Sequence, residues 1–121
     1  MINKKQPLRI HIGKTSIGSV SEFLSTNPIP PGVIWCIQNF AIENETSVTI
    51  KVRSYVEGHG YNHYLWEQRS ALAGNLYWFS DDFYIGEGEQ ITVTFSGTVS
   101  GDLLHIYLSG YKITSSGGGF D

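Results

Sequence analysis

Two of the four histidines are spaced like metal ligands. His59 and His63, in the segment HGYNH, stand four residues apart, a spacing that would place two imidazoles on one face of a helix. Gly60 and the surrounding turn residues argue against a helix, and no third ligand follows at a suggestive distance. We therefore expect both histidines to lie in a loop and the chain to bind no metal. His11 and His105 each alternate with apolar residues, which predicts partly buried, hydrogen-bonded packing in strands.

The densest group of carboxylates is Asp81 and Asp82, followed by Glu87 and Glu89. Two carboxylates at the right separation can hydrolyse a glycosidic bond, and several with loop carbonyls can hold calcium. The sequence has no calcium-loop pattern and no defining spacing for either chemistry. We expect these residues to form a solvated acidic edge.

The single cysteine, Cys36, lies inside the apolar run GVIWCIQNF. Burial makes a thiol a poor nucleophile, so a pairing of Cys36 with His105 for catalysis is not expected. The sequence also has no Gly-x-Ser-x-Gly motif, phosphate loop or dinucleotide fingerprint. These observations predict a protein that is not an enzyme and that uses no cofactor.

Aromatic residues are concentrated in one part of the chain. Eight of them fall between positions 61 and 84: Tyr61, Tyr64, Trp66, Tyr77, Trp78, Phe79, Phe83 and Tyr84. Such rings can fill a two-sided core, anchor a protein interface or stack on sugar rings. The candidate glycan platform consists of Tyr64, Trp66, Tyr77 and Trp78. The three interpretations remain open at this point.

The segments that must position these residues have apolar residues at every second position. In TSVTIKVRSYV, the residues Val48, Ile50, Val52 and Val56 alternate with polar ones, and QITVTFS and LRIHIG repeat the pattern. Gly-rich turns separate the runs. Seven or eight short strands separated in this way predict an all-β fold, a β-sandwich or jelly roll of antiparallel strands with an extended N-terminal arm.

The domain organisation follows from prolines and glycines. The segment NPIPPG, residues 27–32, interrupts any regular element because its three prolines lack backbone donors. We predict an N-terminal arm and entry segment at residues 1–31, a β-sandwich core at 32–114 and a flexible Gly-rich tail at 115–121. A helical turn with capping-box spacing is the alternative to irregular structure at 19–25.

Charge is distributed unevenly along the 121 residues, which carry a formal net charge of −3. All eleven acidic residues follow position 14, whereas four of the eight basic residues lie at or before it. These four are Lys4, Lys5, Arg9 and Lys14. We expect this basic arm to bind a negatively charged partner. Four charges without a basic helix or an aromatic-lined basic groove do not indicate nucleic acid, and no run approaches the ~18 apolar residues of a membrane helix.

The stretch GDLLHIYLSGYKI, residues 101–113, carries apolar or aromatic residues on both faces of one predicted strand. The face that we assign to the core carries Leu104, Ile106 and Leu108. The opposite face, which we predict to be an oligomer interface, carries Leu103, His105, Tyr107 and Tyr111. No second layer of this chain is obviously available to cover that face, so a partner subunit is expected. A bulge or bend is expected near Gly110.

Several segments together resemble the small jelly-roll virion proteins of tailed bacteriophages, of the capsid decoration or cement type. They are VIWCIQNFAIENETSVTIKVRSYV, ALAGNLYWF, GEGEQITVTFSG and GDLLHIYLSGYKI, in which a strand opens after a Gly-Glu or Gly-Asp pair and the last strand ends in Ser-Gly-Tyr. The resemblance covers roughly two thirds of the chain. It implies a non-enzymatic protein that assembles as a trimer, clamps neighbouring capsid subunits and lays its basic arm along an acidic lattice.

The sequence therefore predicts two alternative functions. The first is a virion structural protein, made in the host cytoplasm, that decorates a capsid and binds the major capsid protein or another virion protein as a homo-oligomer. The second is a carbohydrate-binding module of a phage tail or spike.

Overall fold

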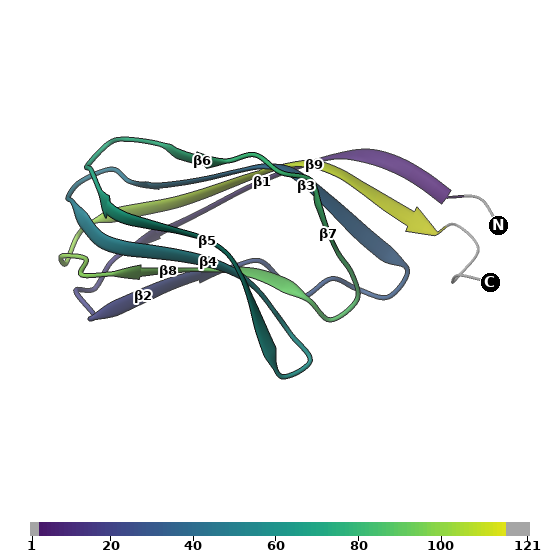
Figure 1. The fold of residues 1–121 in the computed structure, drawn as a ribbon, viewed down its shortest axis with the longest axis horizontal. Coiled ribbons are helices and arrows are strands. Elements are labelled where there is room, and N and C mark those ends of the chain that lie inside the picture. The colour runs from purple at the N-terminus through teal and green to yellow at the C-terminus, as the bar shows by residue number, and fades with distance from the viewer. Residues whose placement is uncertain (1–2, 116–121) are drawn as a thin grey trace.

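The computed structural model describes residues 3–115, and every regular element among them is a β-strand (Figure 1). The strands are β1 (Asn3–Thr15), β2 (Ser21–Ser25), β3 (Val33–Asn44), β4 (Thr49–Gly58), β5 (Tyr61–Ala71), β6 (Tyr77–Phe79), β7 (Phe83–Ile85), β8 (Gln90–Ser96) and β9 (Leu103–Ser115). Within this range no helix is long and apolar enough to cross a membrane.

The nine strands form two antiparallel sheets that pack face to face (Figure 1). In the β1–β9 sheet the order is β1-β9-β3, and the far side of β3 pairs with β6 along residues 40–42 and with β7 along residues 35–37. The β2–β8 sheet has the order β2-β8-β4-β5. Because β6 and β7 share one position, the arrangement is a sandwich of two four-position layers. The predicted all-β jelly-roll or sandwich fold is confirmed.

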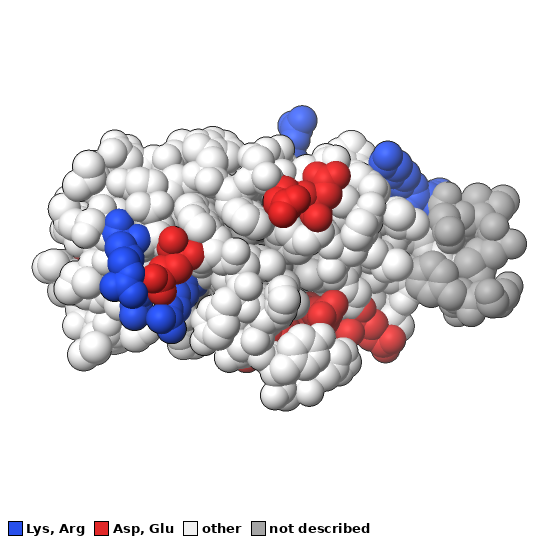
Figure 2. Space-filling view, in the orientation of Figure 1, with Lys and Arg blue, Asp and Glu red and all other residues white. Residues whose placement is uncertain are grey.

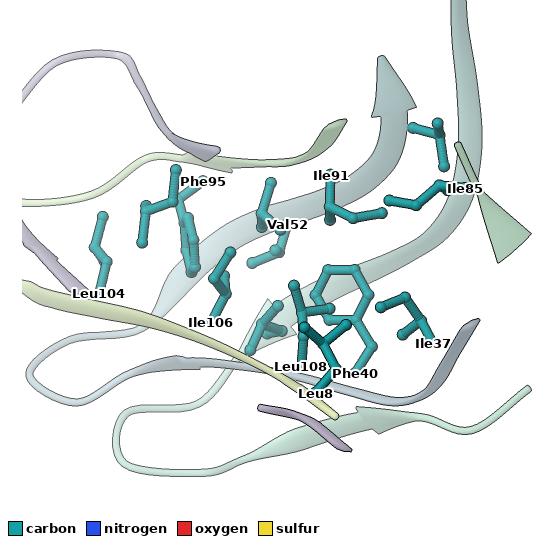
Figure 3. Packing of buried hydrophobic residues seen from close by; sticks show 14 of the residues in the cluster. Leu8, Ile37, Phe40, Val52, Ile85, Ile91, Phe95, Leu104, Ile106 and Leu108 are labelled. Atoms are coloured by element: carbon teal, nitrogen blue, oxygen red, sulfur yellow. The ribbon is translucent and has the colours of Figure 1, made fainter. Parts of the chain in front are cut away.

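The hydrophobic core lies between the inner faces of the two sheets (Figure 3). The predicted core residues of β9, Leu104, Ile106 and Leu108, are at most 2% exposed, so this prediction is confirmed. The facing sheet contributes Val52, Ile91 and Phe95, among others. The odd-numbered positions 91–95 of β8 are fully buried as predicted, but the intervening Thr92 is also buried, with an exposure of 2%.

The N-terminal segment is part of the sandwich, which corrects the predicted division into an arm at 1–31 and a core at 32–114. Residues 3–15 pair with β9 along their whole length, from Asn3 opposite Ser115 to Thr15 opposite Leu103. The side chain of Leu8 is buried in the core. The sequence misled because the edge strand carries few apolar residues. Basic side chains and a proline are typical of edge strands, where they discourage pairing with other molecules.

The helical turn considered for residues 19–25 is also absent, since 21–25 form β2 and pair with β8. Leu24 points inward with an exposure of 3%, whereas Phe23 is 61% exposed on the outer face. The capping-box spacing has a different structural basis: the Glu22 carboxylate accepts hydrogen bonds from the backbone amides of Ile17 and Ser19 at the β1–β2 turn. Of the predicted tail, Ser115 belongs to β9 and positions 116–121 lie outside the described residues.

The irregularity expected near Gly110 lies in the neighbouring strand. The pairing of β3 with β9 shifts between Ile37 and Asn39, so β3 carries a bulge opposite Gly110. A Cβ atom on Gly110 would collide with the carbonyl oxygen of Cys36. Glycine is therefore required here by close backbone approach, and β9 itself keeps its alternation on both sides of the bulge.

The inward placement of Val48 and Ile50 is wrong, because these side chains are 51% and 68% exposed. Thr49 takes the buried position, where its hydroxyl accepts a hydrogen bond of 2.9 Å from the Asn44 side-chain amide. A satisfied hydroxyl can thus replace an apolar residue at a strand end. The placement of Val52 and Val56 in the core is confirmed.

Candidate binding face

The outer face of the β1–β9 sheet carries rings in positions that usually hold polar side chains. Strand register aligns His11, Tyr107, Ala41 and Trp78 across β1, β9, β3 and β6. Trp78 is 59% exposed. The small Ala41 side chain lies between Tyr107 and Trp78 in this row. Ala41 is fully buried, so the side chains around it, including the two large rings, cover this position.

A second row of rings crosses the same face beyond the β3 bulge. Tyr111 is paired with Pro7 on one side and Cys36 on the other, and Cys36 is paired with Tyr84. The hydroxyls of Tyr84 and Tyr111 are 3.4 Å apart, and the Lys5 ammonium lies 4.1 Å from the centre of the Tyr111 ring. Hydrogen bonding to Tyr84 and to the Cys36 thiol raises the pKa of Tyr111. Tyr84 is 61% exposed.

We name this surface the aromatic face. Its members are His11, Trp78, Tyr84, Leu103, His105, Tyr107 and Tyr111. The structure places all four residues of the predicted oligomer interface, Leu103, His105, Tyr107 and Tyr111, on it. Leu103 is 42% exposed, and the other three are half-buried by their neighbours in the sheet. Tyr111 lies two rows from Tyr107, beyond Ser109.

Two histidines meet on the aromatic face. The Nε2 atom of His11 is 2.8 Å from the Nδ1 atom of His105, although the two residues are 94 positions apart in sequence. The other ring nitrogen of His105, Nε2, lies 2.5 Å from a carboxylate oxygen of Glu45. The histidines are therefore the central members of a chain of polar contacts. The predicted hydrogen bonding is confirmed, and the predicted partial burial holds for His105, whereas His11 is exposed.

Tyr107 holds His11 in place. The two rings are stacked, with centroids 4.7 Å apart and planes 6° apart. The Tyr107 hydroxyl donates a 3.3 Å hydrogen bond to the Glu43 carboxylate. Burial, together with the negative charge of Glu43, raises the pKa of Tyr107. The phenol is thus a fixed, uncharged hydrogen-bond donor at neutral pH.

A hollow of about 340 Å³ lies beside this stack. Trp78 and Tyr107 supply its rings, and the side chains of Arg9, Asn39 and Ser109 supply polar groups. The Ser80 hydroxyl donates a 3.1 Å hydrogen bond to the Asn39 side-chain oxygen, an interaction that leaves the Asn39 amide nitrogen as a further donor. A shallow apolar surface with a few hydrogen-bonding groups can hold a flat polar ring.

The predicted glycan platform is not assembled. Trp66 packs inside the sandwich against Phe40 and Phe79, with ring centroids 6.2 and 6.1 Å away. Tyr77 packs against the core, and its hydroxyl accepts the backbone amide of Leu72. Tyr64 lies on the outer face of the β2–β8 sheet, and only Trp78 belongs to the aromatic face. The prediction failed because alternation does not specify which sheet a strand joins.

The four basic residues of the predicted arm lie along the edge strand β1. Arg9 borders the hollow and Lys5 covers Tyr111. Lys14 has a different role, because its ammonium is 2.8 Å from the buried carboxylate of Glu22. Lys4 is exposed. Arg9 and Lys5 therefore border the aromatic face, whereas Lys4 has the strand parity of the buried Leu8.

The other candidate groups remain apart from this face. His59 lies in the β4–β5 turn, where its ring contacts the backbone oxygen of Glu87, while His63 is in β5. Within residues 3–115 no group of three or more histidine, cysteine or acidic side chains is arranged to hold a metal ion. Asp81 and Asp82 are exposed between β6 and β7. Figure 2 shows charged side chains in a few separate groups on the face that it presents.

Glu22, which closes the β1–β2 turn, is 2% exposed. The hydrogen bond from Lys14, with others from the amides of Ile17 and Ser19, lowers its pKa from 4.5 to about 2 despite burial.

A second buried carboxylate, Asp102, joins the turns before β4 and β9. Burial disfavours its charged form, but hydrogen bonds from the Ser47 hydroxyl, the Val99 amide and the Asn44 side chain together lower its pKa. Both carboxylates have their hydrogen-bonding capacity used within the fold, so we assign them to stability.

Sequence analysis missed Asn39, Glu43 and Glu45 as neighbours of the predicted interface. All three belong to β3 or the residue after it. Asn39 is paired with Ser109, Glu43 contacts Tyr107 and Glu45 contacts His105, only because β3 pairs with β9. The polar positions following the apolar run of β3 were the available signal. That signal marks an outward face, but it does not identify the neighbouring strand.

No known protein family matches the sequence, and no curated protein sequence matches it. Among solved structures, the chain is similar to one described as "CBM4 structure and function", with 15% identity, a TM-score of 0.39 and coverage of 89% of this chain and 84% of that one. It is also similar to murine APRIL at pH 5.0, with 14% identity, a TM-score of 0.43 and coverage of 87% and 99%.

A third similar structure is that of the infectious bursal disease virus Gx strain, with 12% identity and a TM-score of 0.45. The match covers 97% of this chain but only 33% of the viral chain, so the protein spans about a third of that length. Similarities at this level give no information about ligands or partners.

Proposed function

We propose that the chain is a non-enzymatic structural protein of a virion, of the capsid-decoration type. In this proposal the aromatic face joins copies of the chain into a trimer, and the basic β1 edge beside it binds an acidic capsid lattice. The observation that carries the proposal is the group of exposed rings on the outer face of a sheet whose inner face already supplies the core.

The most exposed rings of the aromatic face lie outside the core of the sandwich. Trp78 and Tyr84 are 59% and 61% exposed, and they add nothing comparable to the buried contacts of the core. Tyr and Trp are enriched at protein interfaces, because each combines a large apolar surface with a polar group. Grouped exposed rings of this kind mark an interaction surface. Double-sheet jelly rolls also occur among viral capsid domains.

The basic edge suits the second contact. Lys4, Lys5 and Arg9 lie on β1 with no acidic residue on that strand. Exposed cations along one edge raise the rate and the specificity of association with an acidic surface more than its affinity. The proposed lattice contact should therefore weaken as salt rises.

The test compares molar masses by light scattering. We expect the full chain to be a trimer and the double variant with Trp78→Ser and Leu103→Ser to be a monomer. The matched control carries Phe23→Ser and Val48→Ser, which remove similarly exposed apolar groups away from the aromatic face. It should remain a trimer. A monomeric full chain, or equal dissociation of both variants, would refute the proposed interface.

The hollow on the aromatic face favours a second candidate, a carbohydrate-binding module. Trp78 and Tyr107 offer rings for stacking, while Arg9 and Asn39 offer donors for sugar hydroxyls. A glycan array probed with the full chain tests this candidate. Binding that is lost in Trp78→Ala and kept in Tyr64→Ala would support it. An array without signal would eliminate it.

A further inference from the structure

We propose that His11 and His105 form a binding site for a divalent transition-metal ion of the zinc class on the aromatic face. The ion would take the position between the two facing ring nitrogens. The site is contained in one chain, so it does not depend on the proposed self-association or on the proposed virion role.

The first supporting observation is the convergence of two imidazole nitrogens. His11 Nε2 and His105 Nδ1 are 2.8 Å apart, and the ring centroids are 5.0 Å apart. In the hydrogen bond one of these nitrogens carries the proton. When His11 instead carries its proton on Nδ1, and His105 keeps its own on Nε2 beside Glu45, both facing nitrogens direct a lone pair toward the same small region. Zinc binds imidazole nitrogen at about 2.0–2.1 Å, so a small rotation of either ring lets both nitrogens reach one ion. Imidazole ligands suit zinc, copper and nickel ions better than calcium or magnesium.

The second observation is the support behind each imidazole. His105 uses its remaining nitrogen, Nε2, for the Glu45 carboxylate at 2.5 Å. Metal-binding histidines commonly have such an outer carboxylate, which fixes the ring and increases its basicity. His11 is held from its flat side by the stacked Tyr107 ring, which Glu43 anchors in turn. These contacts hold the two rings near the orientation that binding requires, so only a small rotation is needed.

The third observation is the close approach of the imidazole pair to Gly13, which is paired with His105 across β1 and β9. A Cβ atom at this position would lie 3.2 Å from His105 Nδ1 and 3.7 Å from His11 Nε2. The missing side chain therefore leaves the coordinating nitrogens accessible. Gly13 does not need a left-handed backbone, because its φ angle is not positive.

Two imidazoles leave the remaining coordination positions to water or to an incoming donor. Among the described residues no third histidine, cysteine or acidic group completes the set. An open site of this kind exchanges its ion more readily than a closed structural site with four protein ligands. His11 is exposed and the His105 side chain retains 18% exposure, so an ion can enter from solvent.

The test is calorimetric titration of the full chain, free of any affinity tag, with zinc chloride. We expect one ion per chain, and no measurable binding in either His11→Ala or His105→Ala. The double variant His59→Ala with His63→Ala removes the same number of imidazoles elsewhere and should bind as the unmodified chain does. Absence of binding, or loss of binding only in the control, would overturn the proposal.

Two further variants separate the site from general damage to the fold. Gly13→Val keeps both histidines but fills the space beside them, and it should abolish binding while circular dichroism stays unchanged. Glu45→Gln should weaken binding about tenfold, the lower end of the effect of losing an outer carboxylate. Unchanged zinc binding in Gly13→Val would overturn the placement of the ion. Light-scattering mass recorded on the same samples reports separately on the proposed trimer.

Discussion

The outer faces of the two sheets differ in how their charged and hydrogen-bonding side chains are paired. On the β2–β8 sheet, Arg53 and Arg69 both pair with Glu67, at 2.7 and 2.9 Å. In the same sheet the Thr92 hydroxyl lies 2.8 Å from that of Ser25. Rings on this face are covered by cations: the Arg53 guanidinium lies 5.6 Å from the centre of the Tyr64 ring. Many polar groups of this face are therefore paired within the sheet, although Phe23 and Tyr64 are 61% and 56% exposed on it and Thr92 is buried.

The aromatic face uses its polar groups differently. Glu43 and Glu45 hold Tyr107 and His105 in fixed orientations, while Trp78 and Tyr84 stay exposed. Exposed ion pairs contribute little to stability, so the pairs of Arg53 and Arg69 with Glu67 should add little to the free energy of unfolding. The difference supports the proposal that the aromatic face contacts another molecule, whereas many polar side chains of the β2–β8 face pair with one another.

Of the changes considered, removal of β1 should have the largest effect on the stability of the fold. Deleting residues 1–15 takes away one edge of the β1–β9 sheet together with the buried Leu8 side chain. We expect the deleted chain to lose cooperative thermal unfolding. The triple variant Lys4→Gln, Lys5→Gln and Arg9→Gln keeps the strand and should keep the transition. A folded deletion variant would show that this segment is a separable arm after all.

Truncation on the inner face of β9 should lower stability much more than truncation on its outer face. Leu108→Ala creates a cavity in the core and should lower the free energy of unfolding by about 2–5 kcal/mol. Leu103→Ala, on the aromatic face of the same strand, should change it by less than about 0.5 kcal/mol in the monomer. Urea denaturation at low protein concentration measures both. Similar losses in the two variants would contradict the assignment of faces.

The close approach of β9 to the β3 bulge should make Gly110 intolerant of a side chain. Gly110→Ala introduces a Cβ atom against the Cys36 carbonyl oxygen and should cost about 1–3 kcal/mol, as overpacking does. Gly86→Ala is the control, because a Cβ atom there meets no atom within 4 Å. Thermal denaturation should separate the two variants by several degrees. A neutral Gly110→Ala would mean that the bulge is misplaced.

Acid should weaken the fold through carboxylates that belong to neither outer surface. The lowered pKa of Glu22, about 2 in the folded chain, stabilises the protein fully above pH 4.5, and this stabilisation is lost as pH falls toward 2. The lowered pKa of Asp102 acts in the same direction. Denaturation between pH 6 and pH 3 should show a shallower pH dependence in Glu22→Gln. If stability depended on pH identically in Glu22→Gln and the unmodified chain, the contact between Lys14 and Glu22 would not be a source of the acid sensitivity.

The fold class and the core of β9 could be predicted because they depend on local patterns. Alternation assigned Leu104, Ile106 and Leu108 to the interior, and Gly-rich turns separated the strands. The role of β1 could not be predicted in this way. Its apolar positions are few, and its position follows from pairing with β9, almost a hundred residues away.

The candidate site was predictable only in part for the same reason. The two-faced pattern of β9 identified Tyr107 and His105, because one strand displays both faces in its own sequence. His11 and Trp78 join them through pairing between distant strands, and Trp66 was misassigned because alternation leaves the choice of sheet open. Local chemistry therefore identified side chains, and topology decided which of them meet.

Oxidative footprinting of the full chain tests the central claim most directly, because it compares both outer faces in one sample. Hydroxyl radicals modify exposed rings, and mass spectrometry reports each ring separately. As protein concentration rises, we predict that Trp78 and Tyr84 become protected while Phe23 and Tyr64 stay reactive. Equal reactivity of both faces at every concentration, or protection of Phe23 and Tyr64 alone, would contradict the assignment of the aromatic face as the contact surface.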